Sequence, residues 1–127
     1  METLGIGLDL CEIARVGRLL EKYPRFQERC FTEHEREYAN RFAFPARRFA
    51  ARFAGKEAVM KSLGTGYRQI RWQDVEITGG GAPTVNLRGT ASRRAAQLGV
   101  SVVRVSITHT DETAMVIAMA IGVGIDL

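Results

Sequence analysis

Long apolar segments are missing from this sequence of 127 residues. No run of 18 or more apolar residues occurs, which argues against a membrane-spanning helix. The N-terminal segment METLGIGLDLCEIAR has no basic start and carries acidic residues early, so it is not typical of a secretory signal peptide. We therefore expect a cytoplasmic protein that makes no contact with a membrane.

Cysteine, histidine and proline are also scarce, with two, two and three residues. Cys11 and Cys30 lie far apart without a CxxC spacing, which favours two reduced, apolar side chains. Two distant histidines cannot form a histidine-based zinc site by themselves. An apolar fraction of 46% and a charged fraction of 25% are ordinary for a globular chain. The length predicts one domain over residues 1–127.

Basic residues outnumber acidic ones by 18 to 14, and 15 of the basic residues are arginine. Guanidinium groups pair well with phosphates and carboxylates. The net charge of +4 therefore indicates an anionic partner, which could be a nucleic acid, a phosphate-rich cofactor or an acidic protein. The charge alone does not choose among the three.

The first half of the chain predicts one strand and three helices. Residues 4–9 favour a strand that ends at Asp9. Residues 12–23 favour a helix that Pro24 ends. Its two faces are an apolar one of Ile13, Val16, Leu20 and Tyr23 and a basic one of Arg15, Arg18, Lys22 and Arg25. Thr32 and Glu35 have the spacing of a capping box before a short helix. Pro45 and Gly64 delimit an alanine-rich helix of about five turns.

The second half predicts two hairpins and a helix. Strands are expected at 70–78, 83–87, 101–108 and 114–122, with a helix at 91–99 capped by Thr90. The last strand contains no charge, so we expect it to be buried on both faces or packed in an oligomer interface. The fold class is α+β, an antiparallel sheet with a long central helix.

A lysine interrupts the apolar stripe of that long helix. On a helical wheel Lys56 falls within the arc of Phe49, Phe53, Met60 and Leu63, and Glu57 lies at its edge. Lys56 could extend its ammonium group to water while Glu57 pairs with Lys61 on the surface. Alternatively, these charges could hold a metal and phosphates, because a buried lysine needs an anion nearby.

Two further polar positions bear on this choice. Asp9 stands at the end of the first expected strand and before a helix, where an acid is either a helix cap or a ligand. Together with Glu57 it would offer two oxygen ligands, which suits Mg²⁺ completed by water and substrate phosphate. His109 follows a strong strand, in the segment SITHTDE, and is either an ordinary turn residue or a phosphate-binding group.

Three segments stand out in this order along the chain: GIGLDLCEIAR, RFAGKEAVMKSLG and VSITHTDETAMVIAMA. In order and spacing they resemble the bacterial-type holo-[acyl-carrier-protein] synthases, which are small 4'-phosphopantetheinyl transferases. The resemblance implies transfer of 4'-phosphopantetheine from coenzyme A to a serine of acyl carrier protein in fatty acid or polyketide biosynthesis. It also implies Mg²⁺ and a homotrimer with active sites between subunits. Gly55 and Thr108 depart from the alanine and serine common in the family.

Carried over by position, the resemblance assigns a role to each matching residue. Asp9 and Glu57 match metal ligands, and Lys61 matches a lysine near the transferred phosphate. The expected contacts to coenzyme A come from Arg52, Lys56, Lys61, Gly64, Gly66, Pro83, His109 and Thr110. We expect Glu57 also to take the proton of the attacking serine.

The basic helix face then acquires a candidate use. Arg15, Arg18, Lys22 and Arg25 could meet an acidic helix of the carrier protein, and Phe26 could anchor it. The alternative reading of the whole chain is a small basic RNA-binding module. Against this alternative, the sequence has neither the pair of aromatic residues on one strand nor the GxxG loop that common RNA-binding folds use.

Overall fold

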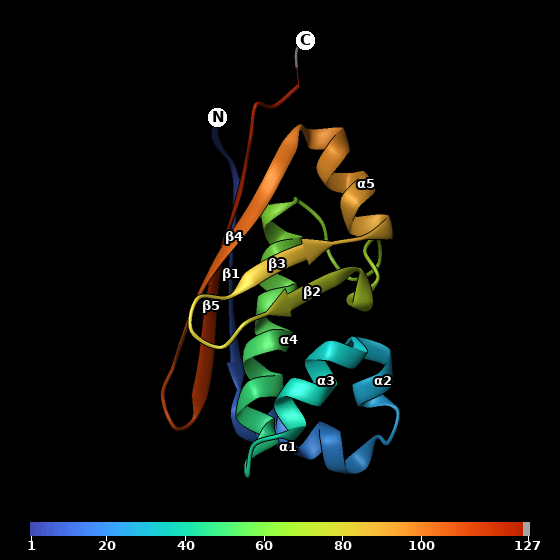
Figure 1. The fold of residues 1–127 in the computed structure, drawn as a ribbon, viewed down its shortest axis with the longest axis vertical. Helices are drawn as coiled ribbons and strands as arrows, with labels where there is room; N and C mark the ends of the chain where they lie inside the picture. Colours follow the sequence, from blue (N-terminus) through green and yellow to red (C-terminus); the bar gives the residue numbers. More distant parts are fainter. Residues whose placement is uncertain (126–127) are drawn as a thin grey trace.

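The computed structural model describes residues 1–125, in which helices pack on one face of a three-stranded antiparallel sheet of order β1-β5-β4 (Figure 1). A two-stranded ribbon, β2-β3, packs on the central helix α4 and beside β4. The strands are β1 (Glu2–Glu12), β2 (Val75–Thr78), β3 (Thr84–Leu87), β4 (Val100–His109) and β5 (Thr113–Gly122). The helices are α1 (Ile13–Lys22), α2 (Phe26–Cys30), α3 (Glu33–Asn40), α4 (Pro45–Ser62) and α5 (Gly89–Leu98), with a 3₁₀ turn, η1, at Trp72–Asp74. The α+β class with a long central helix is confirmed.

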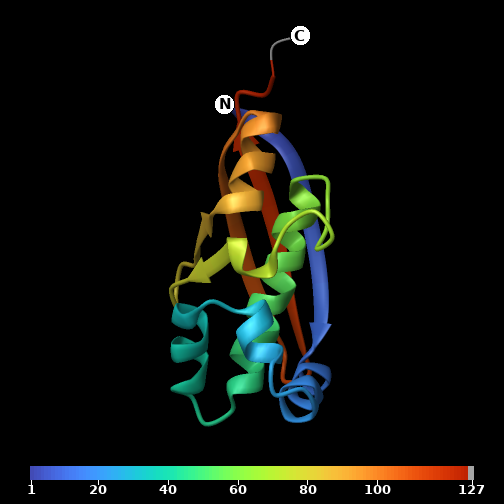
Figure 2. The same ribbon diagram turned by 90° about the vertical axis from the view of Figure 1, so that its right-hand side faces the viewer.

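The packing of α4 on the sheet depends on two glycines of β1. A Cβ atom on Gly5 would lie 2.0 Å from the carbonyl oxygen of Ser62, and one on Gly7 would lie 1.8 Å from that of Ala58. No other residue type would let the two backbones approach so closely. Seen from the helical side, α4 runs along the sheet between β1 and the ribbon (Figure 2). The spacing GIG thus determines how α4 lies on the sheet.

The first strand does not end at Asp9 as expected. β5 pairs with β1 as far as Glu12, opposite Thr113, because the ten-residue strand β5 is long enough to pair with the whole segment. Asp9 is therefore a mid-strand residue on the side that faces α4, and not a helix cap. The helix that follows ends at Lys22 before Pro24, so Arg25 lies outside it.

Two other boundaries also differ from the expectation. Only Val75–Thr78 of the predicted strand at 70–78 is extended, because η1 precedes it. Thr90 does not cap α5, because the helix begins at Gly89, so that Thr90 lies within its first turn. Instead the backbone amide and the hydroxyl of Thr90 both donate to Asp74, at 2.9 and 2.6 Å. A carboxylate from η1 thus satisfies this end of the helix. The capping box of Thr32 and Glu35 is confirmed.

The uncharged strand β5 is buried on one face only. Ala114, Val116, Ala118 and Ala120 pack toward α4. The opposite face, together with neighbouring residues of β1, forms what we call the apolar stripe: Ile6, Leu8, Leu10, Met115, Ile117 and Met119, each 37–66% exposed. Burial on both faces is therefore wrong for the single chain, and the oligomer interface stays a prediction. None of the helices within residues 1–125 is long and apolar enough to cross a membrane.

Candidate active site

Two carboxylates meet where β1 packs against α4. Asp9 points from β1 toward the helix, and Glu57 lies on the facing side of α4. Burial, followed by the charge of Asp9 and a hydrogen bond with it, raises the pKa of Glu57, while Lys61 and Arg15 partly lower it. The Lys61 ammonium lies 3.0 Å from the Asp9 carboxylate and donates to the Leu8 carbonyl. Lys61 thus pairs with Asp9, and not with Glu57 as in one of the two alternatives for these charges.

The residues present fit a divalent cation. Among residues 1–125 no three or more histidine, cysteine or acidic side chains are placed so that together they could hold a metal ion, so the chain would supply two carboxylates. Mg²⁺ is held in this way, because water and substrate phosphates complete its octahedron. Burial and then the neighbouring charge of Asp9 raise the pKa of Glu57, and a cation would counter both by stabilising the ionised carboxylate.

A buried thiol lies beside these carboxylates. Burial, together with the charges of Asp9, Glu57 and Glu12, raises the pKa of Cys11 to about 11 despite the nearby Arg15. Both cysteines are free and buried, as expected. At neutral pH the Cys11 thiol is protonated and is neither a nucleophile nor a metal ligand.

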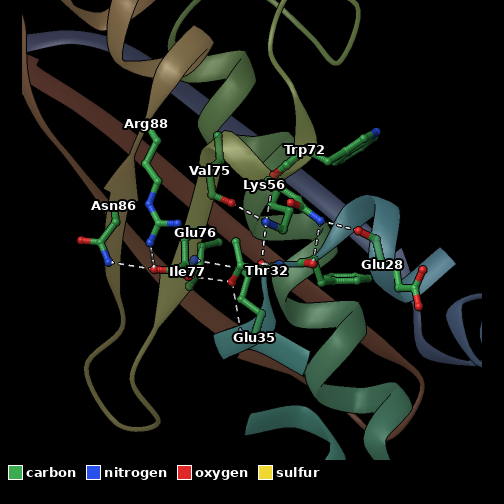
Figure 3. Close-up of polar contacts among 12 residues, drawn as sticks. Glu28, Thr32, Glu35, Lys56, Trp72, Val75, Glu76, Ile77, Asn86 and Arg88 are labelled. Atoms are coloured by element: carbon green, nitrogen blue, oxygen red, sulfur yellow. Dashed lines mark hydrogen bonds and ion pairs between the residues drawn. The ribbon is translucent and has the colours of Figure 1, made fainter. Parts of the chain in front are cut away.

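Lys56 lies on another side of α4 and is enclosed by protein (Figure 3). Its side chain is 0% exposed and its ammonium lies 2.7 Å from the Glu35 carboxylate, so the alternative in which it extends to water is wrong and the one with an anion nearby is confirmed. It also donates to the carbonyls of Trp72 and Val75. An ammonium has three donors. With three acceptors in place, the geometry of this chain leaves none for a phosphate. The partner, Glu35, was predicted only as a helix cap.

The other residues expected at coenzyme A do not gather around Asp9 and Glu57. Arg52 is buried, donates to the Gly79 carbonyl at 3.2 Å and stacks on the Tyr38 ring. Pro83 lies in the connection between β2 and β3. His109 and Thr110 lie at the exposed turn after β4, which β5 separates from β1. Within residues 1–125, none of these side chains forms a hydrogen bond or an ion pair with either carboxylate.

The loop after α4 lies nearer to the carboxylates, because it follows the turn that carries Lys61. Gly64 has a φ of +70°, which favours glycine, and Arg94 on α5 donates to the neighbouring Leu63 carbonyl at 2.9 Å. Gly66 is half-buried and a Cβ atom there would meet nothing within 4 Å. This loop is thus held by α5, with open space beside Gly66.

The basic face of α1 is exposed, and it begins beside the carboxylates. Arg15 lies near enough to Glu57 to lower its pKa, and Arg18, Lys22 and Arg25 are exposed farther along. Phe26 is half-buried and packs against Phe31 and Phe53, so little of its ring is left as an anchor.

Beyond the end of α1 lies a surface hollow of about 960 Å³ that sequence reasoning missed. It does not include Asp9 or Glu57. Its lining combines basic and aromatic side chains, among them Arg25, Phe26, Arg29, Tyr67, Arg71 and Trp72. The aromatic residues near the segment IRWQD were the available signal, but only the fold brings them beside α2.

Comparison with known proteins identifies the family of this chain. The family model described as the 4'-phosphopantetheinyl transferase superfamily matches residues 5–118. The chain belongs to the 4'-phosphopantetheinyl transferase superfamily. A curated relative named holo-[acyl-carrier-protein] synthase, from Caldanaerobacter subterraneus subsp. tengcongensis, is 44% identical over 119 residues, which cover 92% of this chain and 94% of the relative. The relative of the same name from Solibacter usitatus is 47% identical over 111 residues, covering 84% and 89%.

Solved structures of this transferase superfamily share the fold. The holo-[acyl-carrier-protein] synthase of Neisseria meningitidis is 28% identical, with a TM-score of 0.84 over 94% of this chain and 98% of that one. The enzyme of Bacillus anthracis, solved in complex with CoA (3',5'-ADP), is 29% identical, with a TM-score of 0.75 over 93% and 96%. The transferase fold inferred from three sequence segments is thus confirmed.

Replacing Asp9 by asparagine tests whether the carboxylates face each other. The substitution removes the negative charge that disfavours ionisation of Glu57, so we expect the pKa of Glu57 to fall toward its ordinary value of 4.5. An NMR titration of the side-chain carboxyl carbon without divalent cations measures this change. Glu12→Gln, an exposed change on the same strand, should leave the pKa of Glu57 unaltered. An unchanged value in Asp9→Asn would show that the two groups do not interact.

Proposed function

We propose that this chain is a holo-[acyl-carrier-protein] synthase. It transfers 4'-phosphopantetheine from coenzyme A to a serine of apo acyl carrier protein and releases adenosine 3',5'-bisphosphate. The convergence of Asp9, Glu57 and Lys61, in a chain 44% identical to a holo-[acyl-carrier-protein] synthase, carries this conclusion. The family assignment favours this activity over RNA binding. We place it in the cytoplasm, in fatty acid or polyketide biosynthesis.

Asp9, Glu57 and Lys61 lie where β1 packs against α4, a region that we call the seam. These residues suit phosphoryl transfer. The reaction spreads negative charge over phosphoryl oxygens, so the protein contributes mainly positioning and charge stabilisation. Asp9 and Glu57 would hold Mg²⁺, which neutralises the diphosphate of coenzyme A when bound. Lys61 adds a positive charge in the last turn of α4. Glu57 accepts the proton of the attacking serine, which the carrier protein supplies.

The remaining coenzyme A contacts come from a second copy of the chain. Pro83, His109 and Thr110 do not contact the carboxylates within one chain, and a neighbour can bring its own set to them, whereas Arg52 is buried and supports the β2-β3 connection through Gly79. The apolar stripe supports such an assembly, since exposed apolar patches of this kind mark interfaces. We therefore propose a homotrimer whose sheets pack through this stripe, with active sites between subunits.

The basic face of α1 receives the carrier protein. It begins at Arg15 near Glu57 and extends to Lys22, about 10 Å along the helix. An acidic helix lying on it would bring its serine to the carboxylates. Opposite charges would speed the encounter and set the orientation. The hollow beyond, with Arg25 at its edge, offers further basic and aromatic surface.

Replacing Glu57 by glutamine removes one metal ligand with little change in volume. We expect the rate of transfer to fall by about 100-fold or more, because the stabilisation of phosphoryl charge is lost. Mass spectrometry of apo acyl carrier protein after incubation with coenzyme A and Mg²⁺ detects the added arm. The variant should melt no lower than the parent, since the repulsion with Asp9 is relieved. Near-normal turnover in Glu57→Gln, with Glu12→Gln as the matched control, would contradict the metal assignment.

Placing a charge in the apolar stripe tests the assembly. Ile117→Asp should yield monomers and abolish transfer, because a carboxylate at a packed interface is strongly unfavourable. Sedimentation equilibrium measures the molar mass. Phe44→Asp, which alters a residue that is 80% exposed outside the sheet, should leave the trimer intact. A trimeric Ile117→Asp protein would exclude this surface as the interface.

Reversing a charge on α1 tests the docking face. Arg18→Glu should raise the KM for carrier protein about five- to tenfold and leave the affinity for coenzyme A unchanged. Steady-state kinetics and calorimetry measure the two quantities. Arg41→Glu, at the end of α3, makes the same change in net charge and should alter neither. Equal losses for both variants would mean that only overall charge matters. Moderate salt should also raise this KM through screening.

A further inference from the structure

Lys56 lies at the centre of a buried polar network that joins three elements (Figure 3). Its ammonium meets Glu35 of α3 and the carbonyls of Trp72 and Val75, which flank η1. Glu35 in turn accepts from the backbone amides of Thr32 and Ile77, each at 2.9 Å. One ion pair thus ties α4 to the start of α3, to β2 and to η1.

A second ion pair completes the network without contacting α4. The Glu76 carboxylate accepts from the Thr32 hydroxyl at 2.6 Å and from Arg88 at 2.8 Å. Asn86 donates to it from β3 at 3.3 Å. The Glu76 pair holds the ribbon to the start of α3, and it offers a natural comparison for the Lys56 pair.

The contacts of the Lys56 ammonium with Glu35, Trp72 and Val75, which we call the Lys56 clamp, constrain the rotation of α4. Lys56 and Glu57 are consecutive, so their side chains leave the helix about 100° apart. Lys56 is fixed by directional hydrogen bonds on one side, and Glu57 faces Asp9 on another. If α4 turned by about 20°, a carboxylate about 6 Å from the helix axis would move about 2 Å. Mg²⁺ demands near-ideal octahedral geometry and would not tolerate such a shift.

We propose that Lys56 is a positioning residue for phosphoryl transfer, which acts by fixing Glu57 opposite Asp9. This proposal rests on the proposed function. It replaces the expected contact of Lys56 with coenzyme A phosphates by a role inside the protein. The same ammonium holds the Trp72 carbonyl, and the Trp72 ring stacks on Phe53, 4.8 Å between centroids. Trp72 is the single tryptophan of the chain, so its fluorescence reports on the clamp.

The test replaces both charges together, because removing one would leave the other buried and unpaired. The double variant Glu35→Gln/Lys56→Met should fold and assemble like the parent, with the Trp72 emission shifted to longer wavelength. Its kcat should fall about 100-fold, as expected for a misplacement of an ångström or more. The KM for carrier protein should stay unchanged, because α1 is untouched. Mn²⁺ binding in the presence of coenzyme A, followed by electron paramagnetic resonance, should weaken about tenfold.

Arg88→Met is the matched control, since it removes the Glu76 ion pair and leaves α4 alone. Its kcat and Mn²⁺ affinity should stay within about twofold of the parent. A double variant with normal kcat and Mn²⁺ affinity, or an Arg88→Met protein with equal losses, would overturn the proposal.

If the double variant does not fold, the single variant Glu35→Asp decides, because it keeps both charges and shortens the carboxylate side chain. A folded Glu35→Asp protein with lowered kcat supports the positioning role of Lys56. A folded one with parental kcat refutes it. A parent protein that transfers nothing would instead refute the proposed function.

Discussion

The close packing of α4 on β1 is the constraint on which the rest of the structure depends. Two glycines of β1 let the backbones of strand and helix approach within van der Waals contact. That approach places the next inward-facing residue, Asp9, beside the turn of α4 that carries Glu57 and Lys61. Two carboxylates are thereby held together in a half-buried seam, where Lys61 pairs with Asp9 and a divalent cation would further relieve their repulsion. The negative charge of the two carboxylates suits a divalent cation that also binds a diphosphate.

Helix α4 is also held on another side, about 100° around the helix from Glu57, by the buried ammonium of Lys56. Desolvating a lysine is costly, and Glu35 together with two carbonyls offsets that cost. Burial lowers the pKa of Lys56, and the Glu35 carboxylate counteracts this effect. An apolar side chain at this position would only fill space. The buried ammonium also forms directional hydrogen bonds, which fix the orientation of α4. The seam and the clamp together give α4 one position.

The sequence predicted the order and type of the elements well, but it missed several side-chain partners. The fold class, the capping box and the central helix followed from periodicity and end signals. The end of β1 could not be read from LGIGLD, because pairing with β5 extends the strand. For a similar reason the sequence could not decide whether Lys56 is buried, since its partner Glu35 lies 21 positions away and only the fold brings the two together. Gly55 also became intelligible only in three dimensions, since a Cβ there would lie 2.2 Å from the Ile77 side chain.

The apolar stripe illustrates the limit of reasoning from one chain. Its alternation with buried alanines is clear in the strand, yet only the sheet shows that β1 and β5 contribute to one exposed surface. The separation of Arg52, Pro83 and His109 from the carboxylates has the same explanation if copies of the chain share each site. Residues 126–127 of the segment VGIDL lie outside the described residues.

The central claim is that Asp9 and Glu57 hold one divalent cation at the diphosphate of coenzyme A. Anomalous scattering from Mn²⁺ in crystals grown with coenzyme A tests it most directly. The account predicts one strong peak per chain, bonded to a carboxylate oxygen from each residue and to the diphosphate. A peak that lies elsewhere, or that engages neither or only one of the two carboxylates, would contradict it.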